Sequence, residues 1–386
     1  MKYPAKEILA AAREMGPVLR DLRREFHRHP ELGFEEVWTT AKIKEVLSSL
    51  PGITIKPHAQ KTGVVAELTG EKPELGTIGL RCDIDALPIE EKNTHDFVSI
   101  YPGKMHACGH DGHVTTVLGA AMLLSRFRPD HNVRFLFQPA EESNPGGAPG
   151  FIEAGALDGL KEVWGFHLNA TSDFGKVGYY DGAVMSGNFA YDVHVTGKSG
   201  HPAYPESCIN PIEIISNINM NLMSIKSAIR GTRPFIIVPC CMRSGTDTGA
   251  TIPGTGYLSG RCAFLDAEVG ALLKEKIRTI VKNTCDSYGA TAEVVITDHL
   301  PITFNMPCMG ETVRKNAAEF GFEIEEIFPS MGGDDFGYYK DKVSSYYMTY
   351  GIRKGANFPI AHTPIFNFDE EVLTISSAHF ASLALM

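Results

Sequence analysis

The 386-residue chain lacks several features that mark special classes of protein. It has no apolar run of the 18 or more residues that a membrane helix needs. Its first seven residues lack the apolar core of a secretory signal peptide. Basic residues are not in excess, because the net charge is −10, which argues against nucleic acid or an anionic membrane surface as the main partner. We therefore expect no nucleic-acid partner and no membrane partner.

The chain also lacks a paired cysteine framework. Its eight cysteines are scattered, at positions 82, 108, 208, 240, 241, 262, 285 and 308. Without an export signal, the expected location is the cytoplasm, where thiols stay reduced. A reduced compartment leaves Cys108 free to bind a metal.

The densest group of reactive side chains is the stretch of residues 105–113, read Met-His-Ala-Cys-Gly-His-Asp-Gly-His. It holds one thiol, three imidazoles and one carboxylate, and its two glycines permit sharp turns. Thiolate and neutral imidazole are ligands that zinc and similar metals share with carboxylates. Cys108 and His110 are too close in sequence for one helix face but are well placed on a loop. Metal binding is therefore favoured over a histidine-rich surface loop.

Four short apolar segments share one design, in which a predicted strand is followed by polar residues. Residues 77–80 run into Asp83 and Asp85, residues 133–137 into Glu141 and Glu142, residues 162–166 into His167, and residues 345–350 precede His362. A buried helix is expected at residues 114–127 and an amphipathic helix at residues 6–28. Strands that alternate with helices indicate an α/β fold with a mostly parallel sheet. Ligands bind beyond the carboxyl ends of such strands, where these side chains fall.

The pattern changes near Ser186. Residues 186–297 read as two copies of strand–helix–strand, which is typical of a small α+β sandwich with an antiparallel sheet. From about Pro301 the pattern of long helices and strands of the first half returns. Since the length also exceeds what one hydrophobic core usually supports, we expect two domains: residues 1–185 with 298–386 as the metal-binding domain, and residues 186–297 as an insertion.

The adjacent carboxylates of Glu141 and Glu142 are expected to have different roles. Neighbouring residues on extended backbone point in different directions, so one can bind a metal while the other takes a proton from a water whose pKa the metal lowers. The candidate ligands together number five: Cys108, His110, Glu142, His167 and His362. Five are too many for one tetrahedral zinc with an open position, but they suit two ions that share a bridging ligand such as a Cys108 thiolate.

Three aspartates are candidates to orient these ligands, namely Asp83, Asp85 and Asp111. Asp85 leads, because Pro88 stiffens the turn that follows it. His167 or His362 considered alone would be interpreted as a structural histidine. Only the combined set points to a metal centre.

These residues resemble a known family. The chain is similar, nearly end to end, to the dinuclear metallo-amidohydrolases and metallocarboxypeptidases, which include aminoacylase-like enzymes, hippurate hydrolases and auxin–amino acid conjugate hydrolases. The resemblance is carried by Arg81-x-Asp-x-Asp-Ala-Leu-Pro88, by residues 105–113 and by Gln138-Pro-Ala-Glu-Glu142. Supporting matches are His201-Pro-x-x-Pro205, Met331-Gly-Gly-Asp-Asp-Phe336 and the late His362.

The resemblance implies a zinc-peptidase-like catalytic domain interrupted by a lid or dimerisation domain, in a homodimer with two divalent ions (Zn, Mn, Co or Ni) per subunit. The residues that it implies as metal ligands are Cys108, His110, Glu142, His167 and His362. Glu141 matches the general base, and His201 matches a histidine that holds the substrate or the developing oxyanion. The implied reaction is hydrolysis of the amide of an N-acyl amino acid or short peptide. Glu141 would take the proton of the attacking water and then protonate the leaving amine.

One segment departs from the family pattern. Related enzymes usually carry Asn-x-Ile-Pro-Asp in the inserted domain, where it contributes to recognising the substrate's carboxylate, but here the segment is Ala250-Thr-Ile-Pro-Gly254. Substrate identity therefore does not transfer simply. Two alternatives stay open: a dipeptidase or carboxypeptidase, and a non-catalytic protein that binds a metal or an amino acid conjugate. The retained Glu141 weighs against the second, because a pure binding protein has no use for a general base.

Overall fold

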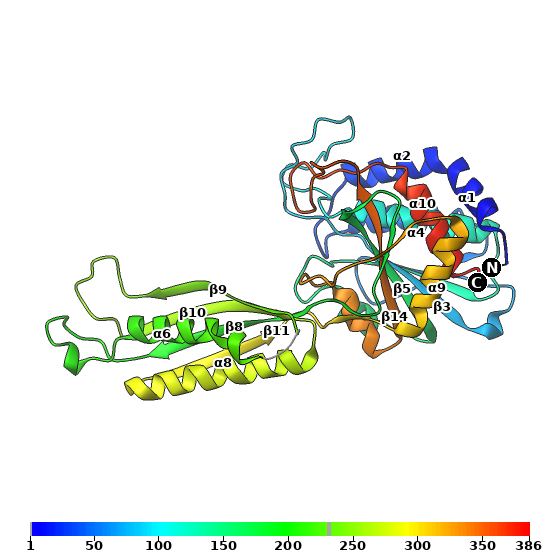
Figure 1. The fold of residues 1–386 in the computed structure, drawn as a ribbon. Coiled ribbons are helices and arrows are strands. Elements are labelled where there is room, and N and C mark those ends of the chain that lie inside the picture. Colours follow the sequence, from blue (N-terminus) through cyan, green and yellow to red (C-terminus); the bar gives the residue numbers. More distant parts are fainter. Residues whose placement is uncertain (1, 230–232) are drawn as a thin grey trace. The chain divides into compact units, whose positions relative to one another are not determined.

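The computed structural model describes residues 2–229 and 233–386 (Figure 1). The chain divides into two compact units. The larger comprises Met1–Gly182, Phe304–Phe328 and Tyr338–Met386, and the smaller comprises Ala183–Thr303 and Pro329–Gly337. The first two crossings between the units fall within short strands, β7 (Gly182–Met185) and β12 (Thr303–Asn305). Within the described residues, no helix has the length and apolar character needed to cross a membrane.

The larger unit is built on an eight-stranded sheet with the order β1-β2-β4-β3-β5-β14-β6-β13. Its centre is parallel, because β3 pairs in parallel with β4 and β5, and β5 with β14. This arrangement confirms the predicted α/β fold with a mostly parallel sheet. The strands are β1 (Ile53–Lys56), β2 (Val64–Leu68), β3 (Thr77–Asp83), β4 (Asn132–Gln138), β5 (Leu160–Asp173), β6 (Val177–Tyr179), β13 (Ile324–Glu326) and β14 (Ser344–Arg353).

Two helices of the larger unit, α4 (His110–Arg126) and α10 (Val372–Leu383), are buried on nearly all sides. They pack against each other and lie beneath α1 (Ala5–Glu14) and α2 (Gly16–Arg28) (Figure 1). A helix covered in this way carries apolar or small residues all round rather than one apolar stripe. The remaining helices of this unit are α3 (Val37–Ser48), α5 (Ala148–Glu153) and α9 (Pro307–Phe320).

The prediction of a single helix over residues 6–28 was wrong. The segment forms two helices, α1 and α2, and the break falls at Met15. Pro17 explains the break, because proline has no N–H to donate within a helix and is accepted in the first turn. The apolar periodicity continues across the break because both helices cover the same core.

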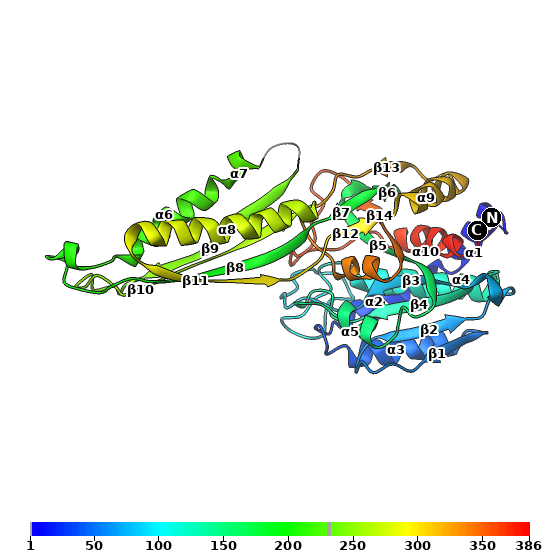
Figure 2. The ribbon, with the colours of Figure 1, turned by 90° about the horizontal axis from the view of Figure 1, so that it is seen from below.

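The smaller unit is a four-stranded antiparallel sheet with the order β11-β8-β10-β9. Helices α6 (Pro211–Met223) and α8 (Ala267–Tyr288) cover one face of the sheet and pack against each other (Figure 2). This confirms the predicted α+β sandwich. The strands are β8 (Gly187–Thr196), β9 (Phe235–Ser244), β10 (Thr255–Phe264) and β11 (Thr291–Asp298), and a short helix α7 (Ile225–Ala228) follows α6.

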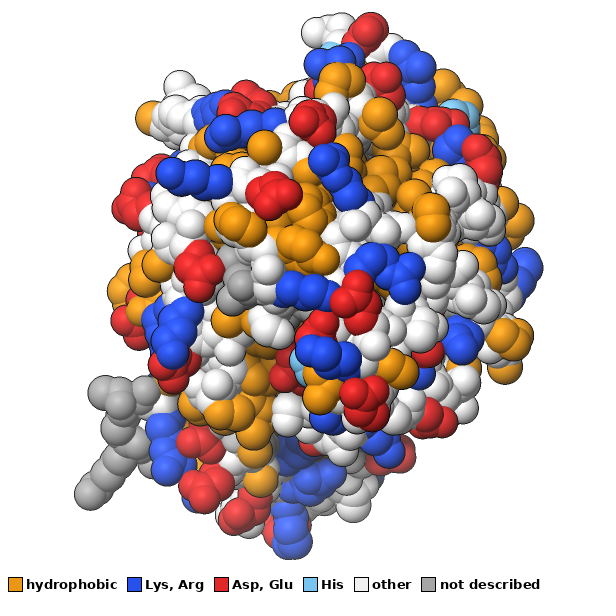
Figure 3. All heavy atoms as spheres, turned by 90° about the vertical axis from the view of Figure 1, so that its right-hand side faces the viewer, with side chains coloured by type: hydrophobic (Ala, Val, Ile, Leu, Met, Phe, Trp, Pro, Cys, Tyr) orange, Lys and Arg blue, Asp and Glu red, His pale blue; other side chains and the backbone are white. Residues whose placement is uncertain are grey.

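The surface is mixed in charge. On the face shown in Figure 3, Lys and Arg side chains are interspersed with Asp and Glu side chains. The excess negative charge is therefore not gathered into one acidic patch on that face.

His379 of α10 is a buried titratable group in the core of the larger unit. Its Nδ1 atom lies 2.9 Å from the hydroxyl of Tyr350 on β14. Burial lowers the pKa of His379 from 6.5 to about 3, because a charged ring cannot be hydrated there. The unfolded chain therefore takes up this proton first as the pH falls, and the native state loses stability between pH 6.5 and pH 3.

We predict that His379→Gln reduces the acid sensitivity of the larger unit. Between pH 7.5 and pH 5 the wild type should lose about 2 kcal/mol more unfolding free energy than the variant, because only the wild type has to leave this histidine uncharged. Urea unfolding followed by tryptophan fluorescence checks this, since both tryptophans, Trp38 and Trp164, lie in the larger unit. His194→Gln removes an exposed histidine of the smaller unit and should keep the wild-type pH slope. Equal slopes for wild type and His379→Gln would contradict the prediction.

Candidate metal centre

Cys108 lies at the end of the loop that leads into α4. Gly109, with a φ of 94°, turns the chain through the left-handed region, and α4 begins at His110. Cys108 is thus on a loop as predicted, whereas His110 is the first residue of a helix. The Cys108 Sγ atom lies 3.3 Å from Nε2 of His167 and 3.3 Å from Nε2 of His362. Three distant parts of the sequence meet at this thiol.

The rings of His110 and His167 are oriented by backbone carbonyls. Nδ1 of His110 lies 2.9 Å from the Asp85 carbonyl oxygen, and Nδ1 of His167 lies 2.8 Å from that of Leu168. A carbonyl only accepts, so in the neutral ring Nδ1 carries the hydrogen and Nε2 keeps its lone pair. Nε2 of His110 is buried and has no hydrogen-bond partner among the described residues. Burial lowers the pKa of His167 to about 3, which keeps that ring in the neutral form that binds metals.

Glu141 and Glu142 follow β4 and are held in place by Asp85. The Asp85 carboxylate accepts the backbone N–H of Glu141 at 3.0 Å and that of Glu142 at 2.9 Å. Oε1 of Glu142 lies 3.1 Å from Nε2 of His362, beside the Cys108 thiol. Asp85 therefore orients both glutamates through their backbone and His110 through its own carbonyl.

Two residues near this centre have a left-handed backbone that residues with a side chain rarely adopt: Ala140 has a φ of 57° and His362 a φ of 65°. Each is held by a backbone hydrogen bond. Glu36 accepts the Ala140 N–H at 2.7 Å, and the Ala107 carbonyl accepts the His362 N–H at 2.8 Å. Conformations of this kind persist where the surrounding structure determines them, and they cluster at functional sites.

Sequence reasoning missed Glu36. Its side chain is fully buried, and burial raises its pKa to about 7. Its hydrogen bond to Ala140 fixes the residue that precedes Glu141. The only signal in the sequence is its place at the start of a helix, residues 35–50 as predicted and α3 in the structure, where acidic residues occur for many reasons.

The predicted ligands form two groups that share Cys108. Cys108, His110 and His167 have ligand atoms within 4.8 Å of one another, and so do Cys108, Glu142 and His362. A further group of the same kind joins His110 to Glu141 and Glu142.

The donors of these groups fit a divalent transition metal. Thiol and imidazole donors suit zinc and its neighbours rather than Mg²⁺ or Ca²⁺, which prefer oxygen. Burial raises the pKa of the Cys108 thiol to about 12, so a nearby cation is needed to hold it as the thiolate. Nε2 of His110, which has no hydrogen-bond partner among the described residues, is a further possible metal ligand.

His113, the last histidine of the motif, has a structural environment. Its Nδ1 lies 2.6 Å from Asp83, and its Nε2 accepts the Leu168 N–H at 3.0 Å. Asp83 also accepts from Arg81 at 2.9 Å. Both ring nitrogens of His113 make hydrogen bonds, so neither is available to bind a metal ion.

Asp111 faces the N-terminal helices. Its carboxylate accepts from Nε of Arg23 at 2.8 Å and lies 2.8 Å from Nδ1 of His27. It also accepts the Gly112 N–H at 2.9 Å. Among the described residues, the side chains that hydrogen-bond to the Asp111 carboxylate belong to α2.

His201 belongs to the smaller unit, where it is exposed, and its Nδ1 accepts the Ala203 N–H at 3.1 Å. The preceding residue, Gly200, exchanges two backbone hydrogen bonds with Ile252, at 3.2 and 2.8 Å. The segment 250–254 that departs from the family pattern therefore lies beside the turn that carries His201. Ser199, Gly200 and Gly254 help to line a cavity of about 470 Å³ there.

Comparison with known proteins finds relatives that align along nearly the whole chain. The chain is 34% identical over 371 residues to N-acetylcysteine deacetylase of Bacillus subtilis, an alignment that covers 95% of this chain and 96% of the relative. It is 36% identical over 373 residues to thermostable carboxypeptidase 2 of Saccharolobus solfataricus, with 94% of each chain covered. Among solved structures, a Bacillus subtilis protein described as a dinuclear metal binding peptidase superposes with a TM-score of 0.87 at 32% identity, covering 97% of this chain and 98% of that one.

The sequence profile of Peptidase family M20/M25/M40 matches residues 79–386, a segment that contains every predicted ligand. The match spans well over half of the chain. Together with the full-length relatives, it shows that the chain belongs to Peptidase family M20/M25/M40 and is a metal-dependent hydrolase.

Proposed function

We propose that this protein hydrolyses the amide bond of N-acyl amino acids with the help of two divalent metal ions. The observation that carries the proposal is the pair of ligand groups that share Cys108 and have Glu141 beside them. The proposed ligands are Cys108, His110, Glu142, His167 and His362. A small acyl-amino acid substrate is supported by the similarity to N-acetylcysteine deacetylase along nearly the whole chain.

The residues divide the chemistry between them. Bound divalent ions would polarise the scissile carbonyl and lower the pKa of the attacking water. Glu141, in one group with His110 and Glu142, takes the proton of that water and transfers it to the nitrogen of the leaving amine. Asp85 holds Glu141 by its backbone, so that the base and its neighbouring ligand keep a fixed spacing.

We propose that residues 186–297 act as a lid or dimerisation domain and that His201 helps to hold the substrate or its developing oxyanion. Support for the second role comes from the exposed ring of His201 and from the cavity beside it. An imidazole donor to an oxyanion is worth about 2.7–4 kcal/mol where it behaves like other such donors.

We propose zinc, manganese, cobalt or nickel as the bound ions. The thiolate favours zinc by softness, and metal supply in the cell decides as much as affinity does. The cytoplasm is the proposed location, because it keeps thiols reduced and all eight cysteines are free.

A second candidate activity is that of a dipeptidase or carboxypeptidase. It is favoured by the 36% identity to a carboxypeptidase over 94% of the chain. Both activities use the same metal centre. They differ in whether the scissile carbonyl belongs to an acyl group or to an amino acid residue. A substrate panel of N-acyl amino acids and dipeptides separates them.

We propose further that the protein forms a homodimer through β9. This strand is at one edge of the smaller unit's sheet and pairs within that sheet with β10 alone. It exposes Ile236, Val238 and Met242. A long apolar edge strand with unpaired backbone groups is a template for another chain, and a second copy of the same strand would cover it.

Glu141→Gln should abolish turnover while the metal ions stay bound. We expect kcat to fall about 10²–10⁴-fold, since the amide cannot take the proton of the attacking water. Hydrolysis of the substrate panel is measured together with metal content per chain. Glu153→Gln, at an exposed position of α5, should be as active as the wild type. Full activity in Glu141→Gln would assign the base to another residue.

Asp85→Asn should weaken metal binding about 10–100-fold, because the amide has one acceptor oxygen for the two backbone N–H groups of Glu141 and Glu142. Competition with a chromophoric chelator measures this affinity. Asp21→Asn, at an exposed position of α2, is the matched control. An unchanged metal affinity would show that Asp85 does not position the ligands.

Val238→Lys should convert the dimer to a monomer, because it places a charge in the proposed interface. Light scattering after size-exclusion chromatography gives the mass in solution. Val37→Lys adds the same charge at an exposed position of the larger unit and should leave the dimer intact. A monomeric wild type, or a Val238→Lys dimer, would refute β9 as the interface.

A further inference from the structure

A second cluster of ligating side chains lies apart from the Cys108 groups, between α2 and residues 91–95, which precede the loop that carries Cys108. His27, Glu91 and His95 have ligand atoms within 4.8 Å of one another. Nε2 of His27 lies 3.1 Å and Nε2 of His95 lies 3.4 Å from the same oxygen, Oε1 of Glu91. Two donors bound to one ion at about 2.1 Å, with an angle of about 90–110° between them, are separated by about 3.0–3.4 Å. The measured spacings have this size.

The outer contacts of the cluster are those of a metal site. Nδ1 of His27 lies 2.8 Å from Asp111, which fixes the ring so that Nε2 faces Glu91. A carboxylate behind a histidine is the usual support of a metal ligand. Asp111 is paired with Arg23 at 2.8 Å. Oε1 of Glu91 also accepts from Nδ2 of Asn93 at 3.0 Å, so an ion bound at the cluster would share this oxygen with Asn93. The second Glu91 oxygen accepts the Ser99 N–H at 2.7 Å, which holds that carboxylate in place.

His95 supplies the independent observation. Both of its ring nitrogens are buried, and neither has a hydrogen-bond partner among the described residues. Buried polar atoms are normally satisfied, so such a pair of nitrogens calls for a partner. The ring cannot turn away freely, because it stacks on Phe97 with 3.7 Å between ring centres and 12° between planes. The ring of His95 is therefore held with Nε2 next to Glu91.

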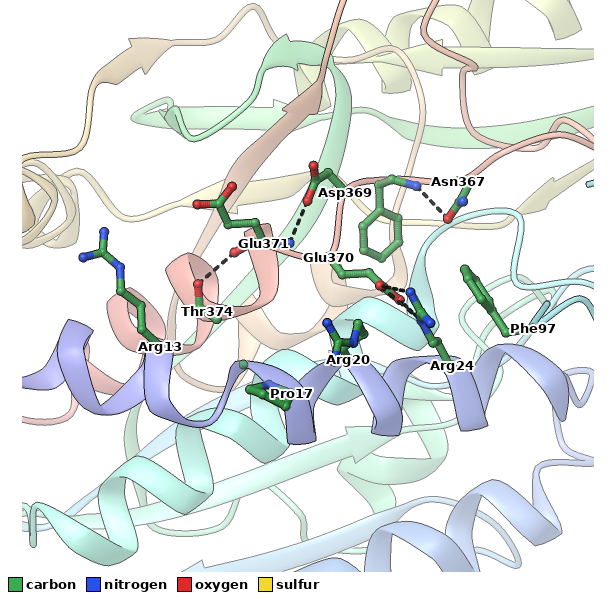
Figure 4. Close-up of a pocket in the computed structure, with 12 residues that line it drawn as sticks. Arg13, Pro17, Arg20, Arg24, Phe97, Asn367, Asp369, Glu370, Glu371 and Thr374 are labelled. Carbon is green, nitrogen blue, oxygen red and sulfur yellow. Dashed lines mark hydrogen bonds and ion pairs between the residues drawn. The ribbon is translucent and has the colours of Figure 1, made fainter. Parts of the chain in front are cut away.

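The cluster is close to solvent. Phe97 lines a surface pocket of about 670 Å³, together with Arg24 and Glu370, which are ion-paired with each other (Figure 4). The side chain of His95 is 17% exposed, whereas that of His27 is fully buried. His95 therefore lies on the solvent side of the cluster and His27 on its inner side.

We propose that His27, Glu91 and His95 bind one divalent transition-metal ion, separate from the ions at Cys108. Two imidazoles and one carboxylate suit zinc, cobalt, nickel or manganese, and solvent supplies the remaining ligands. When the ion binds, Nε2 of His27 releases its proton to solvent and the ion takes its place beside Glu91. The site is structural. It ties residues 84–109, which contain no helix and no regular strand, to α2, and this segment includes Cys108 near its end.

The test is a count of ions by elemental analysis. Chelated protein is reloaded with Co²⁺, passed through a metal-free column and measured as wild type, His95→Asn and His194→Asn. We expect His95→Asn to hold one ion per chain fewer than the wild type and His194→Asn, an exposed histidine elsewhere, to match the wild type. Equal ion counts for wild type and His95→Asn would overturn the proposal.

Two further measurements keep the test decisive. If circular dichroism shows that His95→Asn is unfolded, Glu91→Gln replaces it, because the amide has the shape of the carboxylate and can still accept the Ser99 N–H. Anomalous diffraction at the cobalt edge should show a peak about 2.0–2.2 Å from the three ligand atoms, and no peak there would overturn the proposal. The result is independent of catalysis, since the difference of one ion can be read whether or not the protein hydrolyses acyl amino acids.

Discussion

The arrangement of the proposed metal centre depends on one carboxylate, Asp85. Asp85 follows β3, and its carboxylate accepts hydrogen bonds from the two backbone N–H groups that follow β4. The backbone carbonyl of Asp85 faces the ring of His110 at the start of α4. Three segments are thereby fixed to one another at the edge of a parallel sheet. A buried carboxylate that accepts several hydrogen bonds is held firmly in place, because any movement would leave buried polar groups without hydrogen-bond partners. The spacing between the proposed base and the proposed ligands follows from this constraint.

The sheet makes such a constraint possible. Parallel strands end at a common edge, so the residues that follow β3 and β4 are neighbours although more than fifty positions separate them in sequence. β5 differs from the other strands, because His167 lies within it and the strand continues to Asp173. The ring of His167 therefore reaches the metal centre from within the strand, and the backbone carbonyl of Leu168 orients it.

The centre also stores backbone strain. Ala140 and His362 have left-handed conformations that cost about 1–3 kcal/mol each. Glu36 and the Ala107 carbonyl stabilise these conformations through buried or partly buried hydrogen bonds. The proposed ion site at His27, Glu91 and His95 fits the same scheme, since it would fasten the long irregular segment that leads to Cys108.

The amino-acid sequence by itself determined the family, the parallel and antiparallel halves, and the set of side chains that meet at Cys108. These features are local or repetitive, because motifs such as residues 105–113 and the alternation of strands and helices can be read from neighbouring residues. The break at Met15 was missed because periodicity reports the buried face of a helix and not the continuity of its backbone. Only the tertiary structure decided which nitrogen of His110 faces the metal centre, that Glu36 holds Ala140 and that Asp111 faces α2 rather than the Cys108 ligands. It also decided that His95 lies beside Glu91 with no hydrogen bond to either ring nitrogen. The physical reason is that these contacts join residues far apart in sequence through side-chain directions, and no pattern of neighbours along a chain specifies them.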